Sequence, residues 1–281
     1  MKEEKIFVVS LHRTMTRSVD AYLSILGYRT IHYPKYIRGE NFEERFRGMA
    51  HRPADVLTLL KPVIERFDAL SDIPFPTLYR QLAEQWKNSK FILVHRDPAG
   101  WVNSVRNHLK DRMLAPFDKI QYGPYLGFDV DSLKSVSDKQ LQEMYVRHTQ
   151  AVAHFFEAAG GSQRLCVIRN TAEAAERISR FLKKPLLEMP WITGGNQGPR
   201  EIPSLEYWKR QCPDKADPCY YLAKVYYQQR NFKKARAECE TALALDPTFH
   251  KPRKLLEKIR KKKKLAWFFR LKQVVFSGHP G

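Results

Sequence analysis

The sequence has 281 residues, of which 43% are hydrophobic, so it can form one large domain or a domain with an appendage. No apolar run approaches the roughly 20 residues of a membrane-spanning helix, and the acidic N-terminal residues do not resemble a signal peptide. The formal net charge is +19, but residues 251–272 alone contribute eleven Lys or Arg and one Glu. Roughly half of the net charge is therefore a property of that stretch, and we do not predict a nucleic-acid partner.

The cysteines show none of the close spacings that mark a zinc site or a disulfide framework. They are Cys166, Cys212, Cys219 and Cys239. Such a pattern is typical of reduced thiols, so we predict a cytoplasmic protein without a metal site.

The first predicted element is a buried strand over residues 5–9, followed by a polar turn and a helix that ends near Gly27. The turn combines two arginines with three hydroxyl side chains. A helix N-terminus offers unpaired N–H groups to an anion, so the turn predicts a seat for a phosphate-like or sulfate-like group. It lacks the Gly and Lys of the nucleotide-triphosphate loop. An ordinary turn with exposed arginines is the alternative.

The next stretch alternates short strands with helices. We predict a strand over residues 28–34, a helix near 56–67, a strand end and a proline-stiffened turn over 69–76, and a helix over 77–86.

A second anion seat is predicted after the strand over residues 90–95. Asp97 can cap a helix whose first residue is Pro98, which leaves Arg96 at the carboxyl end of the strand and Ser104 two turns into the helix. Ligands of open parallel sheets bind at the carboxyl ends of strands. Arg96 could instead pair with Asp97.

Residues 111–140 are predicted to be rich in loops, with aromatic side chains that either cover a site or lie in a surface excursion. The aromatics suggest an acceptor with a ring or an apolar body. A helix over 141–156, a strand over 164–168 and a helix over 172–182 follow. The alternation predicts a parallel sheet with helices on both faces.

The composition changes after residue 185. Residues 186–204 suit a linker, and the spacing from Cys219 to Pro247 resembles one 34-residue tetratricopeptide unit. Residues 251–272 predict a basic amphipathic helix, which either caps the repeat or contacts a membrane surface or an acidic partner. We predict a first domain over 1–200 and a helical appendage over 201–281.

Two motifs together resemble the family of sulfotransferases that use 3′-phosphoadenosine 5′-phosphosulfate (PAPS), in its bacterial, plant and fungal branch. Arg13-Thr14-Met15-Thr16-Arg17-Ser18 is similar to the R-T-G-T-T-S loop, with Met15 in place of glycine. Arg96-Asp97-Pro98 with Ser104 is similar to the motif that binds the 3′-phosphate. ALSDIPFPTLYRQLAEQWKNSKFILVHRDPAGWVNS and FLKKPLLEMPW followed by Asn196 add to the likeness, which spans residues 5 to about 200.

The resemblance implies an α/β fold of the P-loop-kinase type and sulfuryl transfer to a hydroxyl or amine of a small molecule, such as a natural product, without a metal. The residues implied in binding PAPS and its product 3′-phosphoadenosine 5′-phosphate (PAP) are Arg13, Thr14, Met15, Thr16, Arg17, Ser18, Arg96 and Ser104. Arg13 would also stabilise the charge that grows on the bridging oxygen.

The base is expected at Asp72, because Asp72-Ile73-Pro74 stands where the cytosolic branch has a catalytic H-x-P. His32, His95 and His108 are rival bases, and we place His32 and His108 with Asp72 on the acceptor side. His12 could contact the donor or make a loop hydrogen bond. Asp72 could equally cap the following helix.

Two other classes of function stay open. A phosphoryl transferase of the kinase type would need Mg²⁺ and a lysine that the loop lacks. A non-catalytic scaffold would use the repeat and the basic helix to bind an acidic partner.

Overall fold

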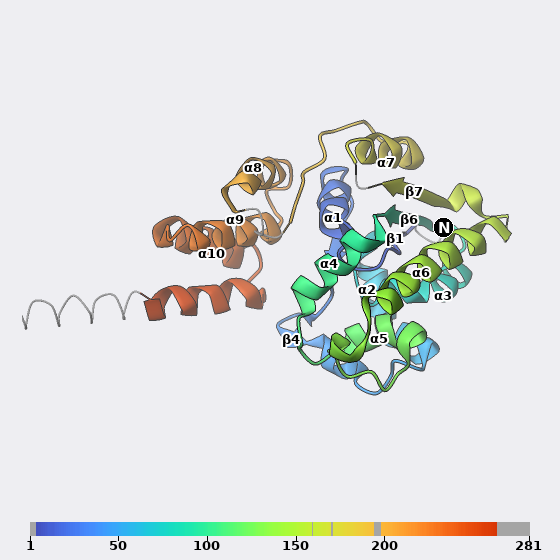
Figure 1. Cartoon of the computed structure of the whole chain (residues 1–281). Helices are drawn as coiled ribbons and strands as arrows, with labels where there is room; N and C mark the ends of the chain where they lie inside the picture. The colour runs from blue at the N-terminus through green and yellow to red at the C-terminus, as the bar shows by residue number, and fades with distance from the viewer. Residues whose placement is uncertain (1–3, 159, 170, 194–197, 263–281) are drawn as a thin grey trace, which may run out of the picture. The chain divides into compact units, whose positions relative to one another are not determined.

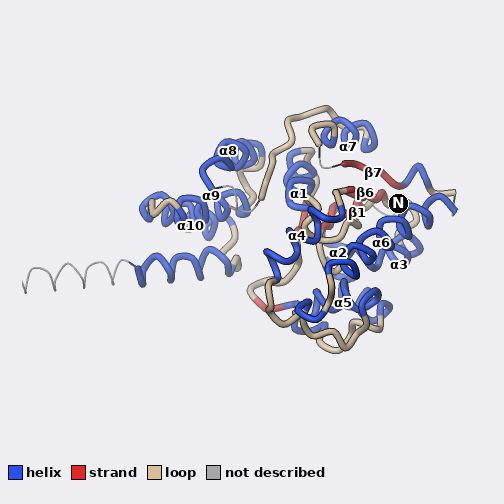
Figure 2. The backbone as a smooth tube through the Cα atoms, viewed as in Figure 1, coloured by secondary structure: helices blue, strands red, loops and turns tan. Residues whose placement is uncertain are grey.

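The computed structural model describes residues 4–158, 160–169, 171–193 and 198–262. The chain divides into two compact units, Met1–Ile192 and Thr193–Gly281. The first unit is a mixed α/β structure and the second is helical (Figure 2).

Five short parallel strands form the sheet of the first unit, in the order β2-β5-β1-β6-β7 (Figure 1). Their bounds are Ile6–Val8 (β1), Thr30–His32 (β2), Ala69–Ser71 (β5), Lys90–His95 (β6) and Leu165–Arg169 (β7). His32 pairs with Ser71 across β2 and β5, so these two strands end level with one another. The residues that follow the strands therefore meet at one edge of the sheet.

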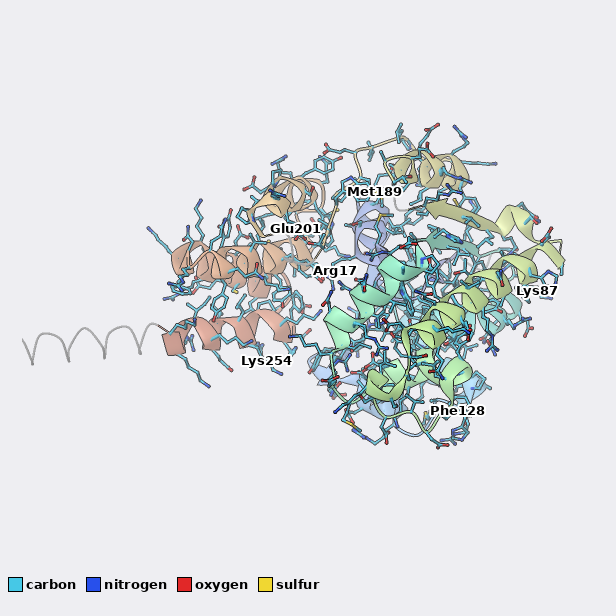
Figure 3. All side chains as sticks on the ribbon, in the orientation of Figure 1. Arg17, Lys87, Phe128, Met189, Glu201 and Lys254 are labelled. Atoms are coloured by element: carbon cyan, nitrogen blue, oxygen red, sulfur yellow. The ribbon has the colours of Figure 1, made fainter. Side chains whose placement is uncertain are left out.

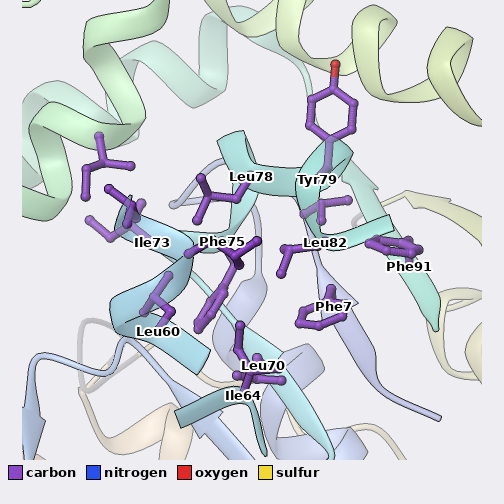
Figure 4. Close-up of a cluster of buried hydrophobic side chains, with 14 of the residues drawn as sticks. Phe7, Leu60, Ile64, Leu70, Ile73, Phe75, Leu78, Tyr79, Leu82 and Phe91 are labelled. Atoms are coloured by element: carbon purple, nitrogen blue, oxygen red, sulfur yellow. The ribbon is translucent and has the colours of Figure 1, made fainter. Parts of the chain in front are cut away.

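Helices cover both faces of the sheet because successive strand residues point to opposite sides. Ile6 and Val8 belong to one buried cluster, whereas Phe7 belongs to the other. Figure 4 shows the cluster around Phe7, where residues of β5, β6 and the neighbouring helices meet. The helices on the Ile6 side are α1 (Thr16–Ile25) and α7 (Ala174–Leu182); those on the Phe7 side include α2 (Pro53–Arg66), α3 (Tyr79–Gln85) and α6 (Asp138–Ala158). The predicted fold class is confirmed.

A third buried cluster joins α4 (Pro98–Leu109) and α5 (Pro116–Leu126) to α6. The expectation of loops over 111–140 is wrong for α5. Its Gly123 and Pro124 hid the helical pattern, since both residues ordinarily break helices. Phe117 and Tyr122 are fully buried in the core, so they give no basis for an aromatic acceptor.

The remaining short elements connect these layers. A two-stranded antiparallel ribbon consists of β3 (Tyr36–Ile37) and β4 (Glu40–Asn41). Short 3₁₀ helices are η1 (Phe42–Phe46), η2 (Phe75–Leu78), η3 (Leu133–Ser135), η4 (Ser162–Arg164) and η5 (Gly198–Glu201).

The second unit contains α8 (Ile202–Gln211), α9 (Ala216–Gln228), α10 (Phe232–Leu245) and a further helix described over residues 250–262. The predicted repeat is confirmed as the α9–α10 hairpin. Cys219 is buried with Ala216 and Ala242, which explains why a small side chain stands there.

Helix α8 supplies a neighbour that the hairpin needs, because a lone repeat cannot bury its own face. The α8 residue Trp208 is 1% exposed and stacks on Tyr221 of α9, with 6.3 Å between ring centroids. The α8 residue Lys209 pairs with Glu238 of α10 at 2.8 Å. The sequence analysis missed α8 because Pro203 follows a proline-rich stretch, although Pro203 lies in the first turn, where proline is tolerated.

Among the described residues, no helix is both long enough and apolar enough to cross a bilayer. The aromatic part of the predicted basic helix, residues 265–271, lies outside the described residues.

Candidate functional site

The loop between β1 and α1 turns through two residues with positive φ. Arg13 has φ 68° and Met15 has φ 74°. Side chains other than glycine reach this region at a cost of about 1–2 kcal/mol each, and such strain is concentrated at functional sites. Met15 therefore adopts a backbone conformation that glycine reaches without a steric cost. The loop delivers the chain to the N-terminus of α1, where Arg17 lies in the first turn (Figure 3).

The hydroxyl groups of this region have partners within the first unit. The hydroxyl of Thr14 donates to the carbonyl of Leu11 at 2.6 Å, and Ser18 Oγ accepts from the N–H of Ile192 at 2.8 Å. Thr16 Oγ1 lies 3.2 Å from His32 Nε2. Thr14 and Ser18 thus hold the loop and the returning C-terminal segment of this unit. Their predicted contact with the donor stays a prediction.

The two predicted anion seats are joined to one another. Arg13 Nε donates to Ser104 Oγ at 3.1 Å, and Arg96 Nη1 donates to the carbonyl of Arg13 at 2.7 Å. Asp97 is occupied elsewhere, because it caps α4 by accepting from the N–H of Gly100 at 2.6 Å. The alternative pairing of Arg96 with Asp97 is therefore not what the structure has.

Positive charge accumulates at this edge of the sheet. Neither Arg13 nor Arg96 forms an ion pair with a carboxylate among the described residues. Burial lowers the pKa of Arg13, and the neighbouring Arg17 lowers it further. Guanidinium groups that repel one another favour a bound anion, because an anion removes that repulsion.

Asp72 and His32 form a second feature of this edge of the sheet. Asp72 directly follows β5, and His32 is the last residue of the neighbouring strand β2. Asp72 Oδ2 lies 3.1 Å from His32 Nε2. The other carboxylate oxygen of Asp72 accepts from the N–H of Ile73 at 2.8 Å. Asp72 has φ 69°, another strained conformation beside the cluster of arginines.

Burial raises the pKa of Asp72 from 3.8 to about 6, and the N–H of Ile73 and the charges of Arg17 and Arg13 limit the rise. A carboxylate of this kind is ionised near neutral pH and is a stronger base than an ordinary aspartate. It can therefore take a proton from a substrate hydroxyl.

Two further histidines border the loop. His12 is buried, and its Nε2 lies 2.5 Å from the hydroxyl of Tyr122, while burial lowers its pKa well below 6.5. His108 faces the His12 ring at 5.9 Å, and partial burial and the charge of Arg13 lower its pKa to about 4. Both rings are neutral near pH 7. His95 instead contacts the ring of Tyr145.

Helix α5 contributes residues that the sequence analysis missed. Gln121 Oε1 accepts from the N–H of His12 at 3.1 Å, next to Arg13 in the chain. Asp118 is 1% exposed and is among the charges that raise the pKa of Asp72. No sequence signal marked these residues, because the segment was interpreted as a loop.

Comparisons with known proteins identify the families that the chain resembles. A family model described as "Sulfotransferase domain" matches residues 5–193, and one described as "Tetratricopeptide repeat" matches residues 216–249. Among solved structures, the chain is similar to a sulfotransferase from Alicyclobacillus acidocaldarius, with 14% identity and a TM-score of 0.39 over 81% of this chain and 96% of that chain. No curated protein matches the chain.

Proposed function

The chain belongs to the sulfotransferase domain family, and from that membership we propose that it transfers a sulfuryl group from PAPS to a hydroxyl or amine of a small molecule. Sulfuryl transfer in general follows from the family. The donor, the acceptor and the roles of single residues are our proposal.

The joined arginine seats are the observation that carries the proposal. PAPS has phosphates at both ends of a nucleoside, and the site offers Arg13 with Arg17 after β1 and Arg96 with Ser104 after β6. Arg96 Nη1 donates to the carbonyl of Arg13 at 2.7 Å, and Arg13 Nε donates to Ser104 Oγ at 3.1 Å, so the two seats adjoin at one edge of the sheet. Charge-assisted hydrogen bonds from arginine suit phosphate oxygens.

The proposed chemistry uses Asp72 as base and Arg13 as the fixed cation. Asp72 takes the proton of the acceptor hydroxyl, whose oxygen forms a bond to the sulfur of PAPS. The bond from sulfur to the bridging oxygen breaks, and PAP leaves with that electron pair. Arg13 stabilises the charge that develops on the bridging oxygen. His32, held between Thr16 and Asp72, orients the carboxylate.

The donor can be tested without knowing the acceptor. We expect PAP to raise the melting temperature of the full chain, whereas ATP with Mg²⁺ has little effect. Stabilisation by ATP with Mg²⁺ alone would favour phosphoryl transfer, and no response to either nucleotide would favour the scaffold.

Arg13→Ala tests the proposed cation. We expect this variant to lose transfer from PAPS when product PAP is measured across alcohols, phenols, amines and sugars. Arg180→Ala is the matched control, because Arg180 is exposed on α7 and, within the described part of the chain, its side chain pairs with Glu176 of its own helix. Equal activity of both variants would contradict the role of Arg13.

A further inference from the structure

Helix α5 lies against both segments that carry the proposed reacting groups. Gln121 accepts from the N–H of His12, and Tyr122 contacts the His12 ring, directly before Arg13. On the other side, the hydroxyl of Thr77 in η2 donates to the carbonyl of Ile120 at 3.2 Å, and η2 follows Asp72 by three residues. The α5 side chains near these contacts therefore lie close to the segments that carry Arg13 and Asp72.

Two polar atoms on α5 are buried without a hydrogen-bond partner among the described residues. Asp118 Oδ2 accepts from Arg112 Nη1 at 2.7 Å and from the N–H of Ala115 at 2.8 Å, but Asp118 Oδ1 has no partner. Gln121 Nε2 meets no partner at full hydrogen-bond geometry either, although the amide interacts with the hydroxyl of Tyr122 and limits the rise of the Tyr122 pKa. Since the amide oxygen of Gln121 accepts from His12, its NH₂ group must face the other way. Buried polar groups without partners are rare in folded proteins.

The chemistry of the two atoms selects one kind of ligand group. Asp118 Oδ1 needs a donor and Gln121 Nε2 needs an acceptor. The residues are three apart on one helix, so their side chains are neighbours. A hydroxyl both donates and accepts, whereas an ammonium only donates, a ketone only accepts and an apolar ring does neither.

We propose that Asp118 and Gln121 bind a second hydroxyl of the acceptor, or two adjacent ones, beside the hydroxyl that is sulfated. The substrate is then a polyhydroxylated compound, such as a polyol or a sugar, rather than a simple phenol or mono-alcohol. This inference rests on the proposed function, because it assumes that sulfuryl transfer takes place next to α5.

The proposal requires the substrate to reach these buried atoms, and Arg112 is the side chain that covers Asp118. Arg112 is the neighbour that reaches solvent: its side chain is 41% exposed, whereas the side chain of Asp118 is 1% exposed. We expect Arg112 to swing away from Asp118 as the substrate hydroxyl enters.

Matched acceptor pairs test the inference on the full chain. With PAPS as donor, PAP release is measured for cyclohexane-1,2-diol against cyclohexanol and for a methyl glucoside against its monodeoxy analogues. We expect kcat/KM to favour the diol or the sugar by at least about tenfold in one pair, because the analogue leaves buried groups unpaired.

Two isosteric variants locate the effect. Gln121→Glu keeps the oxygen that accepts from His12 and replaces the NH₂ group by an acceptor; Asp118→Asn keeps the oxygen for Arg112 and replaces Oδ1 by a donor. We expect each to reduce the preference about tenfold, mainly through KM, while the melting-temperature shift with PAP is unchanged. Gln81→Glu on α3 is the control, since Gln81 also has a buried unpartnered amide oxygen, and it should keep the preference.

The outcomes separate this inference from the proposed function. Turnover of PAPS with equal kcat/KM for each pair overturns the inference alone. A preference that survives in both variants, or falls equally in the control, also overturns it. A chain that neither binds PAP nor uses any alcohol overturns the proposed function and the inference together. If Gln121→Glu does not fold, Asp118→Asn and the wild-type preference decide.

Discussion

Asp72 is buried, has φ 69° and lies 3.1 Å from His32, and burial raises its pKa to about 6. As the proposed base it must be deprotonated, so the rate should rise with pH up to about 6 and then level off. Asp72→Asn should lower kcat by about 10²–10⁴-fold. Measuring kcat against pH for both proteins checks this, and a wild-type rate that stays flat between pH 5 and 7 would argue for another base.

The Asp72 carboxyl stabilises the folded chain at low pH, whereas the proposed rate increases as pH rises. A folded-state pKa raised from 3.8 to about 6 means that the folded chain binds this proton more tightly than the unfolded chain. The resulting stability is complete below pH 3.8 and is lost as pH rises to about 6, in total about 3 kcal/mol. Asp72→Asn removes the titrating group, so we expect it to be more stable than wild type at pH 7.5. Urea unfolding at pH 4.5 and 7.5 measures the difference.

Met15 adopts the backbone conformation of a glycine while its side chain packs against the cluster of Val19 and Ile6. Met15→Gly relieves the strain but loses that packing, so we expect a stability change within about 1 kcal/mol and unchanged PAP affinity. Met15→Val places a branched side chain at positive φ and should destabilise the fold by about 1–2 kcal/mol. Urea unfolding and calorimetric titration with PAP compare the two; equal effects would show that the conformation is not needed.

At the scale of elements, α4 holds the loop that follows β1. Trp101 of α4 is fully buried, and its Nε1 donates to the carbonyl of His12 at 2.8 Å. Trp101→Phe keeps most of the packing but leaves that carbonyl without its donor, at a cost of about 1–3 kcal/mol. We expect PAP affinity to fall as well, because the loop loses a support next to Arg13.

Trp208→Phe is the matched control, because Trp208 is equally buried but belongs to α8 of the second unit. It should leave PAP affinity unchanged in the same titration. An equal loss of PAP affinity in both variants would contradict the role of Trp101 in supporting the loop.

The elements show what a sequence can and cannot predict. Buried strands such as 90–95 and the cap at Asp97 were predictable, because continuous apolar runs and capping residues leave local patterns. Helix α5 was not, since Gly123 and Pro124 interrupt its pattern. The positions of Arg13, Arg96 and Asp72 after strands could be predicted. The unpartnered atoms of Asp118 and Gln121 could not, because lack of a partner depends on the tertiary structure.

For the whole molecule, the boundary between the two units predicts where the chain can be cut. Ile192 donates its N–H to Ser18 in α1, and Met189 is buried in the cluster beneath α1. A chain ending at residue 193 should therefore fold and keep its melting-temperature shift with PAP. One ending at residue 185 loses these contacts and should melt several degrees lower. Equal melting temperatures would show that the returning segment contributes little.

The hydrogen bond from Arg96 to the carbonyl of Arg13 sets the span between the two cationic seats before any ligand arrives. Under the proposed function, this fixed separation would select nucleotides by the distance between their two anionic groups. Adenosine 5′-phosphosulfate, which has no 3′-phosphate, would occupy only one of the two seats. Discrimination between the two sulfated nucleotides would therefore depend on the backbone of the loop as much as on Arg96 itself.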